Sequence, residues 1–122
     1  MTEQATIQFP EELVKETLEL LSKTQTFKKG ANEVTKSLTR TIRGDNNYDP
    51  VKLIVIASDV EPREVTYHLK KQSKQAGIPY VEVHTQESLG AAIGIKRTAA
   101  VAVYDASAFG KIITNASAIL GL

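Results

Sequence analysis

Hydrophobic residues recur at helical spacing in the first third of the chain. A proline followed by two glutamates opens a predicted helix over residues 10–23, because proline fits the first helical turn and carboxylates favour its positive end. A second helix is predicted over residues 31–42, where Val34, Leu38 and Ile42 lie four apart on one face. The stretch FKKG between these helices can hold one short strand.

Short apolar segments alternate with helical segments in the rest of the chain. Residues 52–57 (KLIVIA) form a β-branched run without polar alternation, which is typical of a strand covered on both faces. Ser58 and Asp59 then offer caps for the helix that follows. The other expected elements are helices over residues 62–75, 86–93 and 107–120 and strands over residues 79–84 and 99–104. Alternating elements with such short connections predict an α/β fold, a three-layer α/β/α sandwich around a small mixed sheet.

Glycine and proline residues fall singly between these elements, so residues 1–122 are predicted to form a single domain without an internal linker. The segment 44–50 (GDNNYDP) is dense in turn-forming residues and is expected to be an exposed loop. Gly90 and Gly94 are expected to mark a position of close packing and the end of a short helix.

The composition narrows the class of protein. Of the 122 residues, 42% are hydrophobic and 24% are charged, which is typical of a globular domain. The absence of cysteine excludes a disulfide scaffold and a thiolate metal site, and two histidines make a zinc enzyme hard to build, so no metal or cofactor is expected. The longest apolar run, residues 53–57, is too short to cross a bilayer, and the polar start MTEQAT is unlike a signal peptide. A soluble intracellular protein without a membrane partner is therefore expected.

Positive charge is concentrated on one segment, although the net charge is only +1. Residues 1–24 carry five glutamates against two lysines, whereas residues 28–43 carry five basic residues against Glu33 alone. The charges of residues 44–122 cancel. A local basic segment of this kind steers a polyanionic partner such as nucleic acid.

The stretch GANEVTK, residues 30–36, carries the most informative group of side chains. Asn32 and Glu33 fall in the first turn of a predicted helix and Lys36 follows one turn later, so the three can converge at a helix tip that attracts phosphate or base edges. The amide and the ammonium can donate to guanine, and the carboxylate can accept from exocyclic amines. On spacing alone, the alternative is that Asn32 caps the helix, Glu33 complements its dipole and Lys36 is merely solvated.

Four stretches in unbroken order resemble the kink-turn RNA-binding family: GANEVTK, IASDVEP at 56–62, GIPYVEV at 77–83 and SLGAAIGIKR at 88–97. That family contains the archaeal large-subunit ribosomal protein called L-seven-Ae, its eukaryotic spliceosomal and box C/D nucleolar counterpart, and the related box H/ACA core protein. The resemblance extends from residue 9 to residue 104. Four motifs in register are much more specific than any one of them.

The resemblance implies an RNA-binding role for each matching position. In such proteins the helix tip reads tandem sheared G·A pairs, the residues before it and one further along the helix approach the RNA backbone, and the loop over residues 95–100 packs over a flipped-out base. Two residues after the buried strand line the same pocket, where a base needs an apolar wall and an edge partner. The implied RNA-binding residues are Lys28, Lys29, Gly30, Asn32, Glu33, Lys36, Arg40, Glu61, Val65, Ile95, Lys96, Arg97, Ala99 and Ala100.

The chain departs from the family pattern at three places. GDNNYDP is an insertion where the family usually connects its RNA-reading helix directly to the next strand. Gln86 stands where the nuclear members carry a lysine, which predicts a neutral contact at the flipped base. Ala100 stands where the spliceosomal type has a larger aliphatic residue, which predicts a shallower pocket wall.

The sequence thus predicts a non-enzymatic protein that recognises kink-turns and nucleates ribonucleoprotein assembly, above all of the box C/D small nucleolar RNP and also of the spliceosomal U4 RNP. The alternatives are a large-subunit ribosomal protein of the same family or a box H/ACA component, and, more remotely, a small α/β enzyme that uses Asp59 or Glu61. The expected partners of the monomer are kink-turn RNA (box C/D RNA, U4 snRNA or rRNA) and other RNP core proteins. The expected location is the nucleolus or nucleus of a eukaryote, and otherwise the cytoplasm.

Overall fold

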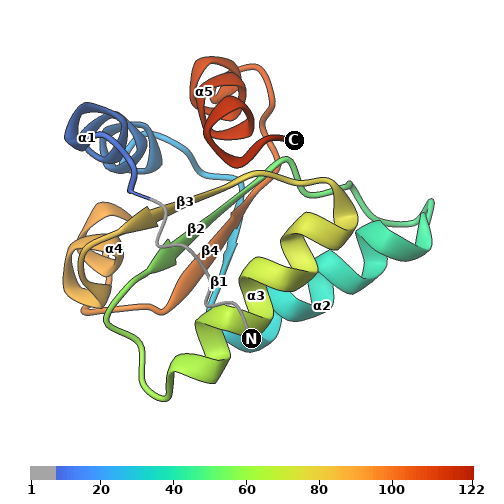
Figure 1. Ribbon diagram of the computed structural model, residues 1–122, viewed down its shortest axis with the longest axis horizontal. Helices are drawn as coiled ribbons and strands as arrows, with labels where there is room; N and C mark the ends of the chain where they lie inside the picture. The colour runs from blue at the N-terminus through green and yellow to red at the C-terminus, as the bar shows by residue number, and fades with distance from the viewer. Residues whose placement is uncertain (1–7) are drawn as a thin grey trace.

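Helices and strands alternate along the chain in a computed structural model that describes residues 8–122 (Figure 1). The polar start that argued against a signal peptide lies outside these residues. The elements are α1 Glu11–Leu21, β1 Phe27–Lys29, α2 Ala31–Arg43, β2 Leu53–Ala57, α3 Arg63–Ala76, β3 Tyr80–Val83, α4 Gln86–Ala92, β4 Ala100–Val103 and α5 Gly110–Leu120. The short strand predicted in FKKG is confirmed as β1.

The four strands form one mixed sheet in the order β1-β4-β2-β3. β2 pairs in parallel with β3 and antiparallel with β4, so that Val55 lies opposite both Val81 and Val101. β1 pairs antiparallel with β4 at the edge of the sheet. All five residues of β2 are buried, as expected for a strand covered on both faces.

Helices cover both faces of the sheet, which confirms the predicted α/β/α layers (Figure 1). Alternate residues of β2 point to opposite faces: Leu53 and Val55 pack with α1, α4 and α5, whereas Ile54 and Ile56 pack with α2 and α3. The sheet separates the two cores, and Phe9 and Val65 are partly buried side chains that pack against both of them. No helix within residues 8–122 is both long and apolar enough to cross a membrane.

Two helices differ from the sequence expectation. Ile42 is 41% exposed rather than buried beside Val34 and Leu38, because each step of four residues turns about 40° beyond a full circle and the third residue leaves the core face. The last helix begins at Gly110 instead of residue 107. A carboxylate oxygen of Asp105 accepts hydrogen bonds from the main-chain N–H groups of residues 107 and 108, which holds this segment in a turn.

The expected capping of α3 is wrong. Its N-cap is Pro62, without a side-chain hydrogen bond. Ser58 instead donates its hydroxyl proton to the carbonyl oxygen of His84 at 3.0 Å, and Asp59 accepts a hydrogen bond from the main-chain N–H of Gln86 at 2.9 Å. Both residues therefore join the end of β2 to the segment that follows β3.

Candidate nucleic-acid interface

The candidate residues gather at one end of the sheet. β4 begins with Ala100 at the end where its two neighbours finish, because Lys29 of β1 lies opposite Val101 and Ile56 of β2 lies opposite Ala100. The chain leaves β1 into α2 and leaves β2 toward α3 at this same end. The N-termini of both helices and the loop before β4 are thereby brought together.

Gly30 makes the turn from β1 into α2 in a single residue. Its φ of +93° lies in a region that side chains disfavour, so glycine suits this position. Its N–H donates to the carbonyl oxygen of Ala100 at 2.8 Å, and its own carbonyl accepts from Val34 at 3.0 Å in the first turn of α2. Gly30 is thus the N-cap, and the alternative in which Asn32 caps the helix is wrong.

The tip of α2 presents unused polar groups to solvent. No side chain caps the helix, so its first N–H groups have no side-chain acceptor. Asn32 and Glu33 are exposed, and Nζ of Lys36 lies 3.9 Å from Oε2 of Glu33 with both side chains about half exposed or more. An exposed pair at this distance contributes little to stability, so both groups remain free to meet a ligand.

The loop between α4 and β4 is fixed by main-chain contacts. The N–H of Ile95 donates to the carbonyl of Gly90 at 2.9 Å, and the N–H of Thr98 donates to the carbonyl of Gln86 at 3.2 Å. A Cβ on Gly90 would lie 2.4 Å from Cα of Arg97, so the loop backbone rests directly on this glycine. The close packing expected at Gly90 is confirmed. The helix ends two residues before Gly94, with Ile93 at its C-cap, and Gly94 follows with a φ of +83°.

Side chains around this loop divide into exposed cations and buried apolar groups. Lys96 and Arg97 are exposed, whereas Ile95 and Ala99 are partly buried. Ala100 corrects the sequence expectation, because its side chain has no exposed surface and belongs to the core under α2 and α3. It cannot form the wall of a pocket for a base, and it acts through its carbonyl, which holds Gly30.

The residues after β2 lie at the same end of the sheet. Glu61 is exposed. Val65, on the first turn of α3, is partly buried and packs against both cores. An exposed carboxylate beside a partly exposed apolar group has the chemistry that a flipped base requires, namely an edge partner and a wall.

The basic residues of the segment 28–43 extend from this end along α2. Lys28 and Lys29 are exposed on β1. Arg40 stands further along α2, where its guanidinium lies 4.1 Å from the ring centre of Tyr48 in the loop 44–50. Tyr48 is not among the residues predicted from the sequence, although a single aromatic residue within a polar loop is an available signal.

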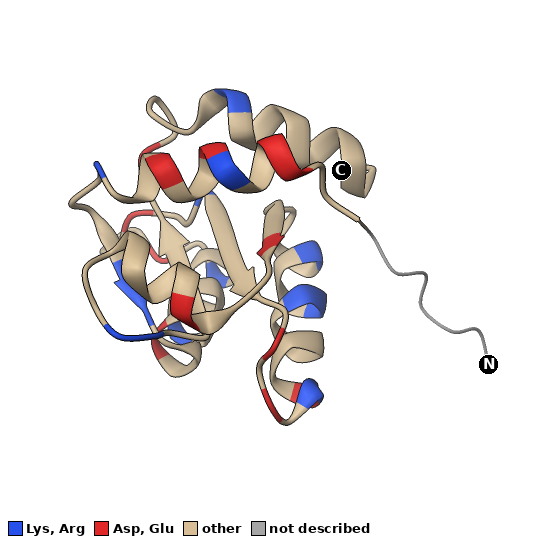
Figure 2. Cartoon of the chain, turned by 90° about the vertical axis from the view of Figure 1, so that its left-hand side faces the viewer, with Lys and Arg blue, Asp and Glu red and all other residues tan. Residues whose placement is uncertain are grey.

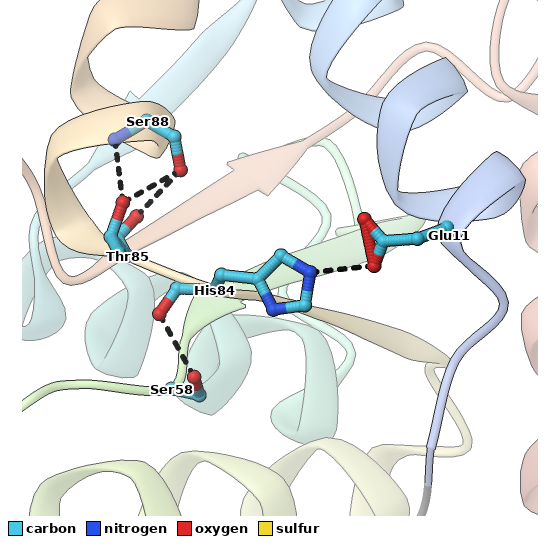
Figure 3. Close-up of polar contacts among 5 residues, drawn as sticks. All are labelled: Glu11, Ser58, His84, Thr85 and Ser88. Atoms are coloured by element: carbon cyan, nitrogen blue, oxygen red, sulfur yellow. Dashed lines mark hydrogen bonds and ion pairs between the residues drawn. The ribbon is translucent and has the colours of Figure 1, made fainter.

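The face of the sheet covered by α1 is acidic, in contrast to the basic face formed by α2. α1 carries mostly acidic residues (Figure 2), and Glu11 at its start forms a contact of 2.6 Å with Nε2 of His84. Figure 3 shows that the Ser58 hydroxyl reaches the main-chain carbonyl of His84 and not its ring. The cluster therefore lacks the contact between serine and imidazole that activates a nucleophile.

Asp59 and Glu61, the residues named for the enzymatic alternative, do not form a catalytic arrangement with each other: Asp59 has a structural hydrogen bond and Glu61 is exposed. Asp59 accepts a hydrogen bond from the main-chain N–H of Gln86, and neither Asp59 nor Glu61 lines the cavity beside the loop 44–50. Within residues 8–122, no group of three or more histidine, aspartate or glutamate side chains could hold a metal ion.

The chain is similar to known proteins in both sequence and structure. The model of the ribosomal protein L7Ae/L30e/S12e/Gadd45 family matches residues 12–113. The large ribosomal subunit protein eL8 of Picrophilus torridus is 40% identical over 101 residues, which is 80% of this chain and 73% of that protein. A solved 15.5kD RNA binding protein of Giardia lamblia superposes with a TM-score of 0.69 at 30% identity, covering 93% of this chain and 88% of the other. A protein from Bacillus halodurans shares the fold at 22% identity with a TM-score of 0.62, covering 90% and 96% of the two chains.

Proposed function

The chain belongs to the ribosomal protein L7Ae/L30e/S12e/Gadd45 family, and on that premise we propose that it recognises kink-turn RNA and nucleates the assembly of a ribonucleoprotein. One observation carries the proposal. The tip of α2, the lysines of β1 and the loop before β4 meet at one end of the sheet, joined by the hydrogen bond from Gly30 to Ala100. This arrangement brings base-reading groups and cations to the same end of the sheet.

The α2 tip supplies the part of the site that reads bases. Asn32 and Lys36 donate to guanine edges, and Glu33 accepts from exocyclic amines, as tandem sheared G·A pairs require. Lys28 and Lys29 contact the phosphates that flank these pairs, where Gly30 leaves room for the RNA backbone.

The flipped base is proposed to lie against the loop before β4. Ile95 and Ala99 give it an apolar surface, Val65 completes the wall and Glu61 offers an edge acceptor. Lys96 and Arg97, both exposed, face the neighbouring phosphates. Gln86 contributes through its main chain, because its carbonyl and N–H hold Thr98 and Asp59.

The mechanism is differential binding. A sharply bent RNA is a minor conformer, and a protein stabilises it only by binding it better than the extended form. The loop before β4 and the turn into α2 are fixed by main-chain hydrogen bonds in the free protein, so little ordering is needed when the RNA arrives. Bending is thereby favoured without any chemical step.

The proposed targets are box C/D small nucleolar RNA first and U4 snRNA second, with other RNP core proteins as partners and a monomer as the binding unit. In a eukaryote this places the protein in the nucleolus or nucleus. The identity of 40% to a large-subunit ribosomal protein favours a second candidate, binding of ribosomal RNA in the large subunit, for which the setting is the ribosome itself. Sequencing of the RNA crosslinked to the protein in its own cell separates the two candidates.

The decisive test replaces Lys36 with alanine. The side chain is 62% exposed, so folding should be unaffected, whereas the loss of a base contact should weaken kink-turn binding by about 1 to 3 kcal/mol. Gel shifts compare a kink-turn with the same RNA whose G·A pairs are replaced by Watson–Crick pairs. Lys15→Ala is the matched control, because Lys15 is exposed on α1, across the sheet from α2. An equal loss on a plain duplex would assign Lys36 to phosphate and contradict its reading role.

A further inference from the structure

A cavity of about 450 Å³ lies between the C-terminal half of α2, the start of β1 and the loop 44–50. Its lining includes the cations Lys28 and Arg40 and the loop residues Asn47, Tyr48 and Asp49. The volume falls within the range of sites that hold small ligands or single groups of a larger one. The cavity shares Lys28 with the interface proposed above, whereas its loop residues Asn47, Tyr48 and Asp49 take no part in that interface.

The loop that closes this cavity is built onto the end of α2. The N–H of Asp45 donates to the carbonyl of Arg40 at 3.1 Å, and Oδ1 of Asp45 accepts from the N–H of Asn47 at 3.0 Å. The N–H of Val51 donates to Oγ1 of Thr41 at 3.0 Å. The insertion thus returns to the helix that it follows instead of extending away from it.

Tyr48 and Arg40 both line the cavity and contact each other. The Arg40 guanidinium lies 4.1 Å from the centre of the Tyr48 ring, so the two planar groups support each other. Tyr48 nevertheless keeps 49% of its surface exposed, which leaves room for a further stacking partner. Within residues 8–122, no carboxylate forms an ion pair with Lys28 or Arg40.

We propose that this cavity binds a nucleotide of the RNA strand that runs on from the α2 tip, with its base on Tyr48 and its phosphate between Lys28 and Arg40. The inference rests on the proposed function. It adds a second contact that lies outside the kink and depends on the insertion 44–50.

The position of the cavity along α2 supports this assignment. A helix rises 1.5 Å per residue, which places Arg40 about 6 Å beyond Lys36 along the axis. A strand of duplex DNA advances about 3.4 Å per nucleotide. An RNA strand with a rise of the same order reaches the cavity within a few nucleotides of the tip. Figure 1 shows the chain leaving α2 at the end remote from Gly30 and turning back toward β2.

The chemistry of the lining also fits a nucleotide. Aromatic rings stack on any base, and cations hold phosphate in the same groove, which is the pattern of single-strand binding sites. Asn47 can donate to and accept from a base edge, and Asp49 can accept from an exocyclic amine. A ligand with only anionic groups would be repelled by the Asp49 carboxylate and would offer it no hydrogen-bond donor.

The test compares two kink-turn RNAs, one with long flanking helices and one trimmed to the kink itself. Tyr48→Ala should weaken binding of the long RNA by about five- to fiftyfold, the size of one lost stacked base, and leave the trimmed RNA within twofold. Tyr48→Phe keeps the ring and should bind both RNAs like the unaltered protein. Tyr67→Ala is the matched control, because Tyr67 is 51% exposed on α3 and does not line the cavity.

The outcomes separate the two levels of inference. Lys36→Ala should weaken both RNAs, and if the unaltered protein binds neither, the proposed function and this contact fall together. If Lys36→Ala acts as expected but Tyr48→Ala weakens both RNAs equally or neither, only the cavity assignment is wrong. Binding of free guanosine monophosphate that Tyr48→Ala abolishes, with affinity for the long RNA unchanged, would assign the cavity to a free nucleotide and overturn the RNA contact.

Discussion

Gly90 is the position where a single methyl group should disturb both the fold and the proposed RNA surface. A Cβ built there lies 2.4 Å from Cα of Arg97, 2.6 Å from its nitrogen and 2.9 Å from its carbonyl carbon. Ordinary contacts are 3.4–4 Å. The obstacle is backbone rather than a flexible side chain, so the loop must retreat by about 1 Å for Gly90→Ala to be accommodated.

The expected cost follows from two opposing effects. Overpacking of this kind destabilises a protein by about 1 to 3 kcal/mol, and replacing a helical glycine with alanine recovers about 0.5 to 1 kcal/mol. The midpoints of these two ranges differ by about 1 kcal/mol, so we expect Gly90→Ala to lower the free energy of unfolding by about 1 kcal/mol and by at most about 2.5 kcal/mol, measured by urea denaturation. Gly110→Ala is the control, because Gly110 begins α5 with open space around it and without a positive φ, so alanine there should leave stability unchanged or raise it.

The same variant tests the role of the loop in binding. Displacement of the loop should lower kink-turn affinity by about tenfold, the equivalent of one lost contact. The measurement is a titration of folded protein at one salt concentration. If Gly90→Ala keeps the stability of Gly110→Ala and full affinity, the loop does not rest on Gly90 as described and the reasoning fails.

Three further predictions concern charge and burial. The basic segment 28–43 is small, so log affinity should fall against log salt with a slope of about −3 to −6, and a slope near −10 would require a second basic surface. Replacing Lys96 and Arg97 with aliphatic residues should restore binding of a kink-turn whose flanking stem is shortened to a terminal loop, and equal binding of both RNAs by the unaltered protein would remove the loop from specificity. Burial, followed by the charge of Glu82, raises the pKa of Tyr80 above its ordinary 10.0, so the folded state keeps the neutral phenol. The contribution of Tyr80 to stability should therefore be complete below pH 10 and lost as the pH rises through the raised pKa. Between pH 9 and pH 11, the free energy of unfolding should fall less in Tyr80→Phe than in the unaltered protein.

The layers of the fold could be predicted because they depend on local patterns. The uninterrupted apolar run of β2 indicated burial on both faces, and helical spacing placed α1, α2 and α3 within one or two residues. The predictions were wrong where the hydrogen-bond partner of a residue lies far away in the sequence. Ser58 and Asp59 are good caps by type, but the segment after β3 offered them hydrogen bonds that no local pattern encodes.

The candidate site could be predicted only as a set of residues. Charge and the GANEVTK stretch pointed to the α2 tip, but their meeting with the loop before β4 depends on the antiparallel pairing of β1 and β4. Ala100 was wrongly expected to face a base, since alternation along a strand decides its direction and the start of β4 could not be fixed to the residue. The stacking of Tyr48 on Arg40 could not be predicted from the sequence, because the path of an irregular loop has no periodic signal.

β1 has a consequence for the protein when no RNA is bound. It is a three-residue strand at the margin of the sheet, and it has no partner on its outer side within residues 8–122. An open margin of this kind can pair with the same strand of another copy and start aggregation, which charged residues discourage by repulsion. Lys28 and Lys29 are both exposed there, so they also keep free copies apart, and a variant in which both are leucine should scatter light as well as lose affinity. The charges proposed to attract RNA thus also protect the RNA-free protein from aggregation through this edge strand.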